Sequence, residues 1–142
     1  RRFEYHVRKE NVIYIDDYAH HPEELKATIL SARELHPNKK IAAAFQPHLF
    51  TRTRDFVDGF AESLSLLDTL YLLEIYPARE LPIEGVDAGI IFDKVTIQDK
   101  HRVSKEELIA QLRKNTPQVF LTLGAGDIDQ LVEPIKTLFE GI

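Results

Sequence analysis

The sequence contains no cysteine, no methionine and no tryptophan. Without cysteine the chain has no disulfide framework, no thiolate nucleophile and no zinc site built on cysteine. A protein without disulfides suits a reducing compartment, so we expect a cytoplasmic location. Because no initiating methionine is present, we also expect the chain to be a fragment of a longer polypeptide.

Basic residues and long apolar runs are scarce as well. Lysine and arginine number 18 against 23 acidic residues, and the formal net charge of -5 argues against a nucleic-acid partner. No run of about 18 apolar residues occurs, so we expect no membrane span. The start, Arg1 to Glu4, lacks the apolar core of a signal peptide.

Two catalytic motifs are also absent. The chain has neither the G-x-S-x-G turn of a serine hydrolase nor the G-x-x-x-x-G-K-[ST] phosphate loop. If the protein uses ATP, the loop that holds the triphosphate must therefore lie on another part of the polypeptide.

The chain does contain a regular alternation of short apolar runs and amphipathic helical stretches. Its 142 residues, 44% hydrophobic and 29% charged, are typical of one globular domain. We expect strands at residues 3–7 and 12–15, forming a hairpin, and at 41–45, 69–75 and 119–123, with helices at 22–35, at 54–66, after 104 and up to 139. This order predicts an α/β fold, a Rossmann-like three-layer αβα domain with helices on both faces of a mostly parallel sheet of about six strands.

Local signals fix the ends of several helices. Pro22 suits a first helical turn, and Ser104 with Glu107 forms a capping box. Asp127 is expected to cap the last helix. In the helix at 54–66 we expect an inward face of Phe56, Val57, Phe60, Ala61 and Leu64. Residues 78–86, with two prolines and a glycine, are expected to form a surface loop.

Polar residues follow the buried strands, where parallel strands would bring their carboxyl ends to one edge of the sheet. These clusters are Asp16 to His21, Gln46 to Arg52, Glu74 to Arg79, and Gly124 to Asp127. We therefore expect one shared site.

Three histidines fall in these clusters. Neighbouring residues at a helix start point in different directions, so His20 and His21 are poor joint ligands of one metal. Each has an ordinary structural reading, capping or packing, and a functional one, donation to a carboxylate or phosphoryl oxygen. His48 makes a zinc site conceivable, but acidic partners at ligand spacing are lacking, and we expect no metal site.

Two arginines follow the same strand as His48. The planar guanidinium of Arg52 suits a carboxylate or phosphate, and its place near the strand end favours a binding role. Arg54 is equally well explained as an exposed partner of Asp55 or Asp58.

Gly124-Ala125-Gly126 is a weak dinucleotide signal, since position 129 is aspartate instead of the third glycine. The carboxylate of Asp127 would also repel a pyrophosphate. The glycines are better explained as a tight turn.

Taken in order, five segments resemble the Mur ligases across nearly the whole chain, within that family the members that use L-alanine. The segments are Arg1-Arg2-Phe3, Asp16 to Pro22, Gln46-Pro47-His48 with Thr51 to Arg54, Tyr76-Pro77-Ala78, and Gly124 to Asp127.

This resemblance implies an ATP-dependent ligase of bacterial peptidoglycan synthesis, acting in the cytoplasm. It implies that residues 1–142 form the carboxy-terminal, amino-acid-binding domain, while a UDP-binding domain and a central ATPase domain are absent from this chain. UDP-N-acetylmuramate, L-alanine and ATP with Mg²⁺ would be its ligands. The carboxylate of the sugar would become an acyl phosphate, and the amine of L-alanine would attack it. The domain would close over the central ATPase domain and be inactive alone.

The resemblance also implies residue roles. Arg2 and Asp17 would contact the nucleotide, and Arg52 would hold the alanine carboxylate. The rest of the amino-acid pocket would be lined by Tyr18, His20, His21 and His48.

One position departs from the family pattern. Leu49 stands where arginine is common, so an arginine contact is missing or is supplied by Arg54 or Arg79. Two alternatives stay open: a recycling ligase that attaches a whole peptide to the same sugar, and a non-catalytic nucleotide-binding or regulatory module. The recycling ligase usually lacks the Gln-Pro-His triplet, so the presence of this triplet at residues 46–48 favours L-alanine as the substrate.

Overall fold

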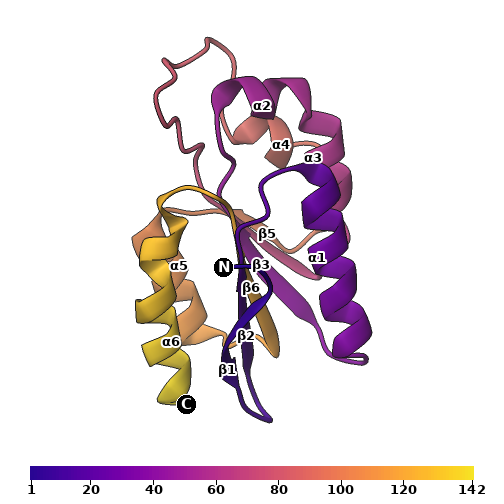
Figure 1. Ribbon diagram of the computed structural model, residues 1–142, viewed down its shortest axis with the longest axis vertical. Coiled ribbons are helices and arrows are strands. Elements are labelled where there is room, and N and C mark those ends of the chain that lie inside the picture. The colour runs from indigo at the N-terminus through magenta and orange to yellow at the C-terminus, as the bar shows by residue number, and fades with distance from the viewer.

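The computed structural model describes all 142 residues and contains one six-stranded sheet between two layers of helices (Figure 1). The strand order is β1-β2-β6-β3-β4-β5, and only the β1–β2 pair is antiparallel. The strands are β1 (Glu4–Arg8), β2 (Ile13–Asp17), β3 (Ile41–Phe45), β4 (Thr69–Leu72), β5 (Lys100–Arg102) and β6 (Val119–Leu123). The predicted fold class, including the N-terminal hairpin, is confirmed.

The helices divide between the two faces of the sheet. On one face lie α1 (Pro22–Leu35), α2 (Phe50–Asp55), α3 (Val57–Leu64) and α4 (Gly89–Phe92); on the other lie α5 (Lys105–Lys114), the 3₁₀ turn η1 (Asp127–Leu131) and α6 (Val132–Glu140). None of the helices is both long enough and apolar enough to cross a bilayer.

The central strands are apolar because helices cover both of their faces. All five residues of β2, β3 and β6 are buried. Alternate side chains feed two cores: Ile15, Phe45 and Leu121 point toward α1 and α3, whereas Tyr14, Ala44 and Phe120 point toward α5 and α6. The two cores clamp the sheet and fix the edge at which β2, β3, β4 and β6 end.

Several predicted details are wrong. The helix expected at 54–66 is two helices, because the backbone leaves helical geometry at Phe56 (φ -122°, ψ 25°). The Phe56 side chain is 44% exposed instead of facing inward. The strand expected at 69–75 ends at Leu72. The sixth strand, β5, is polar and gave no apolar signal.

Helix starts follow the sequence signals in two of three cases. Pro22 opens α1, and Ser104 with Glu107 forms the predicted capping box of α5. Asp127 does not cap the last helix, since the start of η1 has no side-chain cap. Its carboxylate instead accepts a hydrogen bond from Gln46 Nε2 (2.7 Å) and pairs with Lys105 Nζ (2.8 Å).

Candidate functional site

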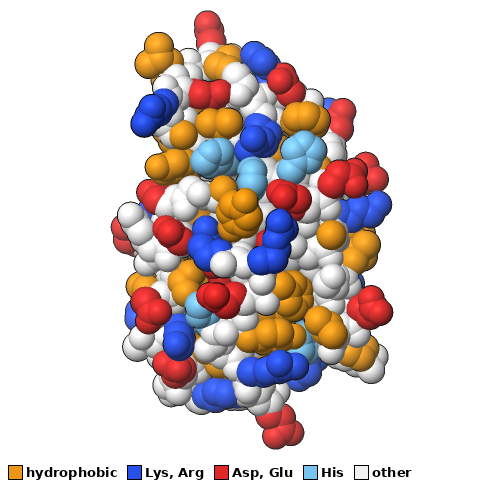
Figure 2. Space-filling view, in the orientation of Figure 1, with side chains coloured by type: hydrophobic (Ala, Val, Ile, Leu, Met, Phe, Trp, Pro, Cys, Tyr) orange, Lys and Arg blue, Asp and Glu red, His pale blue; other side chains and the backbone are white.

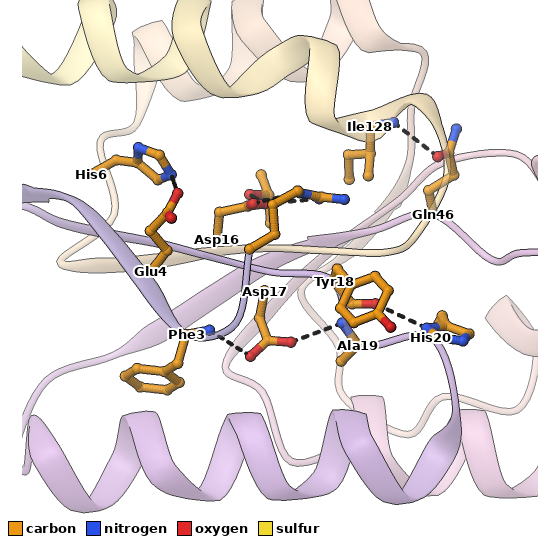
Figure 3. A network of polar contacts seen from close by, with 12 residues as sticks. Phe3, Glu4, His6, Asp16, Asp17, Tyr18, Ala19, His20, Gln46 and Ile128 are labelled. Atoms are coloured by element: carbon orange, nitrogen blue, oxygen red, sulfur yellow. Dashed lines mark hydrogen bonds and ion pairs between the residues drawn. The ribbon is translucent and has the colours of Figure 1, made fainter.

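The segments that follow β2, β3, β4 and β6 are tied together at one edge of the sheet, as predicted. Gln46 is buried: its side-chain amide bonds Asp127, and its Oε1 accepts the Ile128 N–H at 3.0 Å (Figure 3). The next segment is joined by backbone, because Leu49 N–H donates to the Tyr76 carbonyl and Tyr76 N–H donates to that of Pro47. These bonds hold the segment 46–52 at the carboxyl end of the sheet.

The acidic pair at the end of β2 is buried and fully engaged. The carboxylate of Asp16 accepts hydrogen bonds from Nε of Arg1 at 2.8 Å and from the Thr122 hydroxyl at 2.7 Å. Asp17 receives the backbone N–H groups of Phe3 and Ala19, each at 2.8 Å, through its two oxygens (Figure 3). With both oxygens occupied, Asp17 shapes the turn that leads to Tyr18; direct nucleotide contact stays a prediction.

Aromatic rings form a chain across the site. Tyr18 and His20 lie 5.2 Å apart between ring centroids, and His20 lies 6.0 Å from His48. His48 in turn stacks on Tyr76 at 5.6 Å. The Arg2 guanidinium lies over the Tyr18 ring at 5.7 Å. Figure 2 shows imidazoles gathered beside a cationic side chain on this face.

Two nitrogens in this region are buried without a hydrogen-bond partner: Nδ1 of His48 and Nη1 of Arg52. The third such atom, Nε2 of His6, lies outside this region, 2.9 Å from the Glu4 carboxylate. Buried polar atoms are nearly always paired, so the nitrogens of His48 and Arg52 are the candidates in this region for contact with a ligand or a water molecule.

Burial lowers the pKa of His48 below its ordinary value, and electrostatic interaction with the Arg52 guanidinium and with His20 lowers it further. The imidazole is therefore neutral near neutral pH. The Arg52 guanidinium then supplies the positive charge of this pair, and its unpaired Nη1 is available to an anion.

The sequence places these side chains through an unusual turn. Leu49 stands at the N-cap of α2 with a positive φ of 74°, a conformation that costs a non-glycine residue energy. Its carbonyl accepts the Thr53 hydroxyl at 2.8 Å. The turn separates His48, at the strand extension, from Arg52, one helical turn further on.

Three other predicted residues lie outside this group. His21 occupies the N-cap of α1 without a side-chain cap, and its ring packs on Phe56 at 4.8 Å. Arg54 is exposed and pairs with Asp55 at 2.8 Å, the structural alternative considered from the sequence. Arg79 is exposed on the loop that follows β4.

Sequence reasoning missed two residues that complete the site. Tyr76 was grouped with the polar clusters but not expected to stack on His48. Glu80 received no role, although its carboxylate binds the start of α2. The signal for Tyr76 was its place at a strand end, whereas Glu80 gave none because it acts across about 30 residues.

Histidine and carboxylate side chains do not assemble into a metal site anywhere in the chain. No group of three or more His, Asp or Glu residues has the geometry to hold a metal ion. His20 and His48, whose rings lie 6.0 Å apart, have one carboxylate within ion-pair distance, that of Glu24, at 3.5 Å from Nδ1 of His20.

Comparison with known proteins yields several matches. The UDP-N-acetylmuramate–L-alanine ligase of Parabacteroides distasonis is 56% identical over 138 residues, which cover 97% of this chain and 30% of that protein. The solved UDP-N-acetylmuramate–alanine ligase of Thermotoga maritima is 30% identical, with a TM-score of 0.70 over 96% of this chain and 30% of that one.

A third match is a separately solved domain. It belongs to a putative UDP-N-acetylmuramate:tripeptide ligase of Haemophilus ducreyi and is 20% identical, with a TM-score of 0.68. It covers 96% of this chain and 98% of that one, and at this identity it supports the fold alone.

The chain spans about 30% of the length of the curated relatives it matches. The family model described as the glutamate ligase domain of Mur ligases matches residues 1–126, most of the 142 residues. The chain therefore belongs to the Mur ligase family.

Proposed function

We propose that this chain is the carboxy-terminal, amino-acid-binding domain of a UDP-N-acetylmuramate–L-alanine ligase. In the intact enzyme a UDP-binding domain and a central ATPase domain would complete the active site. The product would be the first amide bond of a cytoplasmic peptidoglycan precursor in a bacterium. The relatives that are about half identical to this chain carry this name, which supports the choice of L-alanine as the acceptor.

The observation that carries the proposal is the pair of unpaired buried nitrogens on His48 and Arg52. An amino acid presents a carboxylate, and a guanidinium binds a carboxylate through charge-assisted hydrogen bonds. Because His48 is neutral near pH 7, it adds no second positive charge to repel the ammonium end of the amino acid. Tyr18, His20 and His48 would line the pocket, with His21 at its helix-start side.

ATP with Mg²⁺ would supply the phosphoryl group that activates the sugar carboxylate. This chain has few groups that could bind ATP. The exposed guanidinium of Arg2 suits a phosphate, but both oxygens of Asp17 already accept hydrogen bonds from backbone N–H groups. The residues thus fit a supporting role at the nucleotide. The triphosphate and Mg²⁺ would be held mainly by the central domain.

Within this division, the residues of this chain position the acceptor. Arg52 holds its carboxylate, so that the amine faces the activated carbonyl. Holding two reactants in an aligned geometry is worth several kcal/mol of the barrier. Cationic and N–H donors at the same edge also suit the oxyanion that forms during attack.

The test uses the intact polypeptide and measures phosphate release from ATP. Release is expected only when UDP-N-acetylmuramate and L-alanine are both present, and the tripeptide should not replace L-alanine. Release that ignores L-alanine, or that requires the tripeptide, would overturn the proposed acceptor.

Arg52→Ala is expected to raise the KM for L-alanine about 10- to 100-fold, because a charged hydrogen bond contributes about 1.5–3 kcal/mol. Arg54→Ala is the matched control, since Arg54 is exposed and already paired with Asp55. Full activity of Arg52→Ala would remove Arg52 from its assigned role.

A further inference from the structure

The loop that follows β4 sends one carboxylate across to the start of α2. One oxygen of Glu80 accepts the backbone N–H groups of Phe50 and Thr51, and the other accepts the Thr51 hydroxyl. The Thr51 hydroxyl, and then the two amides, hold the pKa of Glu80 below its usual range. The carboxylate is therefore charged and its oxygens are engaged with α2.

Helix α2 depends on this contact because it has little support of its own. It is six residues long, and its N-cap residue, Leu49, provides no side-chain cap. Helices this short are not stable alone, and the first N–H groups of any helix need an acceptor. Glu80 provides that acceptor and an anion at the positive end of the helix.

The same helix start carries the two candidate binding groups. His48 lies just before Leu49, and Arg52 lies on the first turn of α2. Nδ1 of His48 and Nη1 of Arg52 are the two buried nitrogens of this region that make no hydrogen bond. A shift of α2 would move Arg52 relative to His48, which is held on Tyr76 by ring stacking and by the backbone bridge between these two residues.

Glu80 is poorly placed to act on a substrate itself. Its oxygens are engaged with α2, and the nearby Arg54 pairs with Asp55 instead of competing for it. Its partners are two backbone amides and one hydroxyl of the protein, all at the start of α2. The contact therefore fixes geometry.

We propose that Glu80 is a positioning residue for the amino-acid pocket, holding the start of α2 so that Arg52 and His48 face the acceptor. This inference rests on the proposed function and deepens it, because it assigns the placement of the acceptor-binding groups to the loop that follows β4.

The first test measures steady-state kinetics of the intact enzyme carrying Glu80→Ala. We expect the KM for the acceptor to rise about 10- to 100-fold, since a displaced Arg52 loses a charged hydrogen bond to the acceptor carboxylate worth about 1.5–3 kcal/mol. The kcat and the KM values for ATP and for the UDP-sugar should stay within about twofold. Glu80→Gln keeps an acceptor oxygen for the two amides and should recover part of the loss.

Glu84→Gln is the matched control, because Glu84 is exposed on the same loop and makes no hydrogen bond to α2. An unchanged acceptor KM in Glu80→Ala would overturn the proposal. An equal loss in kcat and in all three KM values would also overturn it, since that pattern indicates general structural damage.

The second test needs no activity. Amide hydrogen exchange of the intact protein should show faster exchange at residues 49–53 in Glu80→Ala, intermediate exchange in Glu80→Gln and no change in Glu84→Gln. Unchanged exchange in Glu80→Ala would overturn the proposal.

The acceptor is identified first with the wild-type enzyme. If it proves not to be L-alanine, the proposed function fails, but the KM for the true acceptor still decides the role of Glu80.

Discussion

His48 is the residue at which the site couples to folding stability. Burial, then the charges of Arg52 and His20, lower its pKa, while Glu80 opposes the shift. The pKa in the unfolded chain is about 6.5, so below that pH the unfolded state binds more protons than the folded state. The stabilising contribution is therefore present above about pH 6.5 and is lost as the pH falls.

We expect the free energy of unfolding to fall as the pH drops from about 7.5 to about 5.5, because these values bracket the unfolded pKa. His36 contributes in the same direction, since burial and the charges of Arg8 and Lys39 lower its pKa as well. His48→Asn should therefore make the decline shallower without abolishing it. Urea unfolding at several pH values measures this slope, and an unchanged slope in His48→Asn would contradict the prediction.

At the same scale, the sequence predicted which side chains share the sheet edge but not what each contacts. The divergence of His20 and His21 followed from their adjacency, and the rings indeed pack on different partners, His48 and Phe56. The occupied oxygens of Asp17 could not be foreseen, because its partners include the backbone of Phe3, which precedes β1 and lies 14 residues away in the sequence. Long-range hydrogen bonds of this kind leave no periodic signal in the sequence.

Among the elements, the turn after β6 shows how tightly the strand ends pack. A Cβ atom added to Gly126 would lie 2.6 Å from Cγ of Tyr76 and 2.7 Å from Oε1 of Gln46. Those two side chains support His48 and the segment 46–52. The glycine is thus required by close packing, since its own φ of -91° suits any residue.

Gly126→Ala is expected to destabilise the protein by about 1–3 kcal/mol, the usual cost of overpacking. It should also raise the KM for the acceptor, because Tyr76 must move. Gly141→Ala is the control: its added Cβ meets nothing closer than 3.6 Å, and its effect should stay within about 0.5 kcal/mol. Equal unfolding free energies of the two variants, measured in urea, would disprove the steric account.

Most elements with strong apolar periodicity were predicted correctly, and two of the exceptions share a cause. β5 has the sequence Lys-His-Arg, and it forms because β4 offers an open edge and Tyr71 stacks on His101 at 5.3 Å. The break between α2 and α3 at Phe56 lets that ring pack on His21. In both places tertiary contacts override the local pattern.

For the molecule as a whole, the two cores make the domain self-contained, whereas the proposed function makes the site only half of an active site. One core contains 21 buried residues and the other 15, and together they cover both faces of the sheet. The unpaired nitrogens of His48 and Arg52 lie at the sheet edge, which under the proposed function faces the central domain. The isolated chain should therefore be stably folded and yet lack the activity of the intact enzyme.

The 142-residue chain alone is expected to fold cooperatively but to hydrolyse no ATP and to bind ATP weakly. Its cores need no other domain, and the related Haemophilus ducreyi domain was solved as a separate chain. The 142-residue chain has no phosphate loop, and the carboxylate of Asp127 lies at the turn where a pyrophosphate would have to bind. Scanning calorimetry should give one transition, and titration calorimetry should give a Kd for ATP in the millimolar range or no detectable heat. Micromolar binding of ATP by the isolated chain would contradict this division of labour, because the nucleotide site would then lie within the domain and the nucleotide-binding module would become the better reading of the fold.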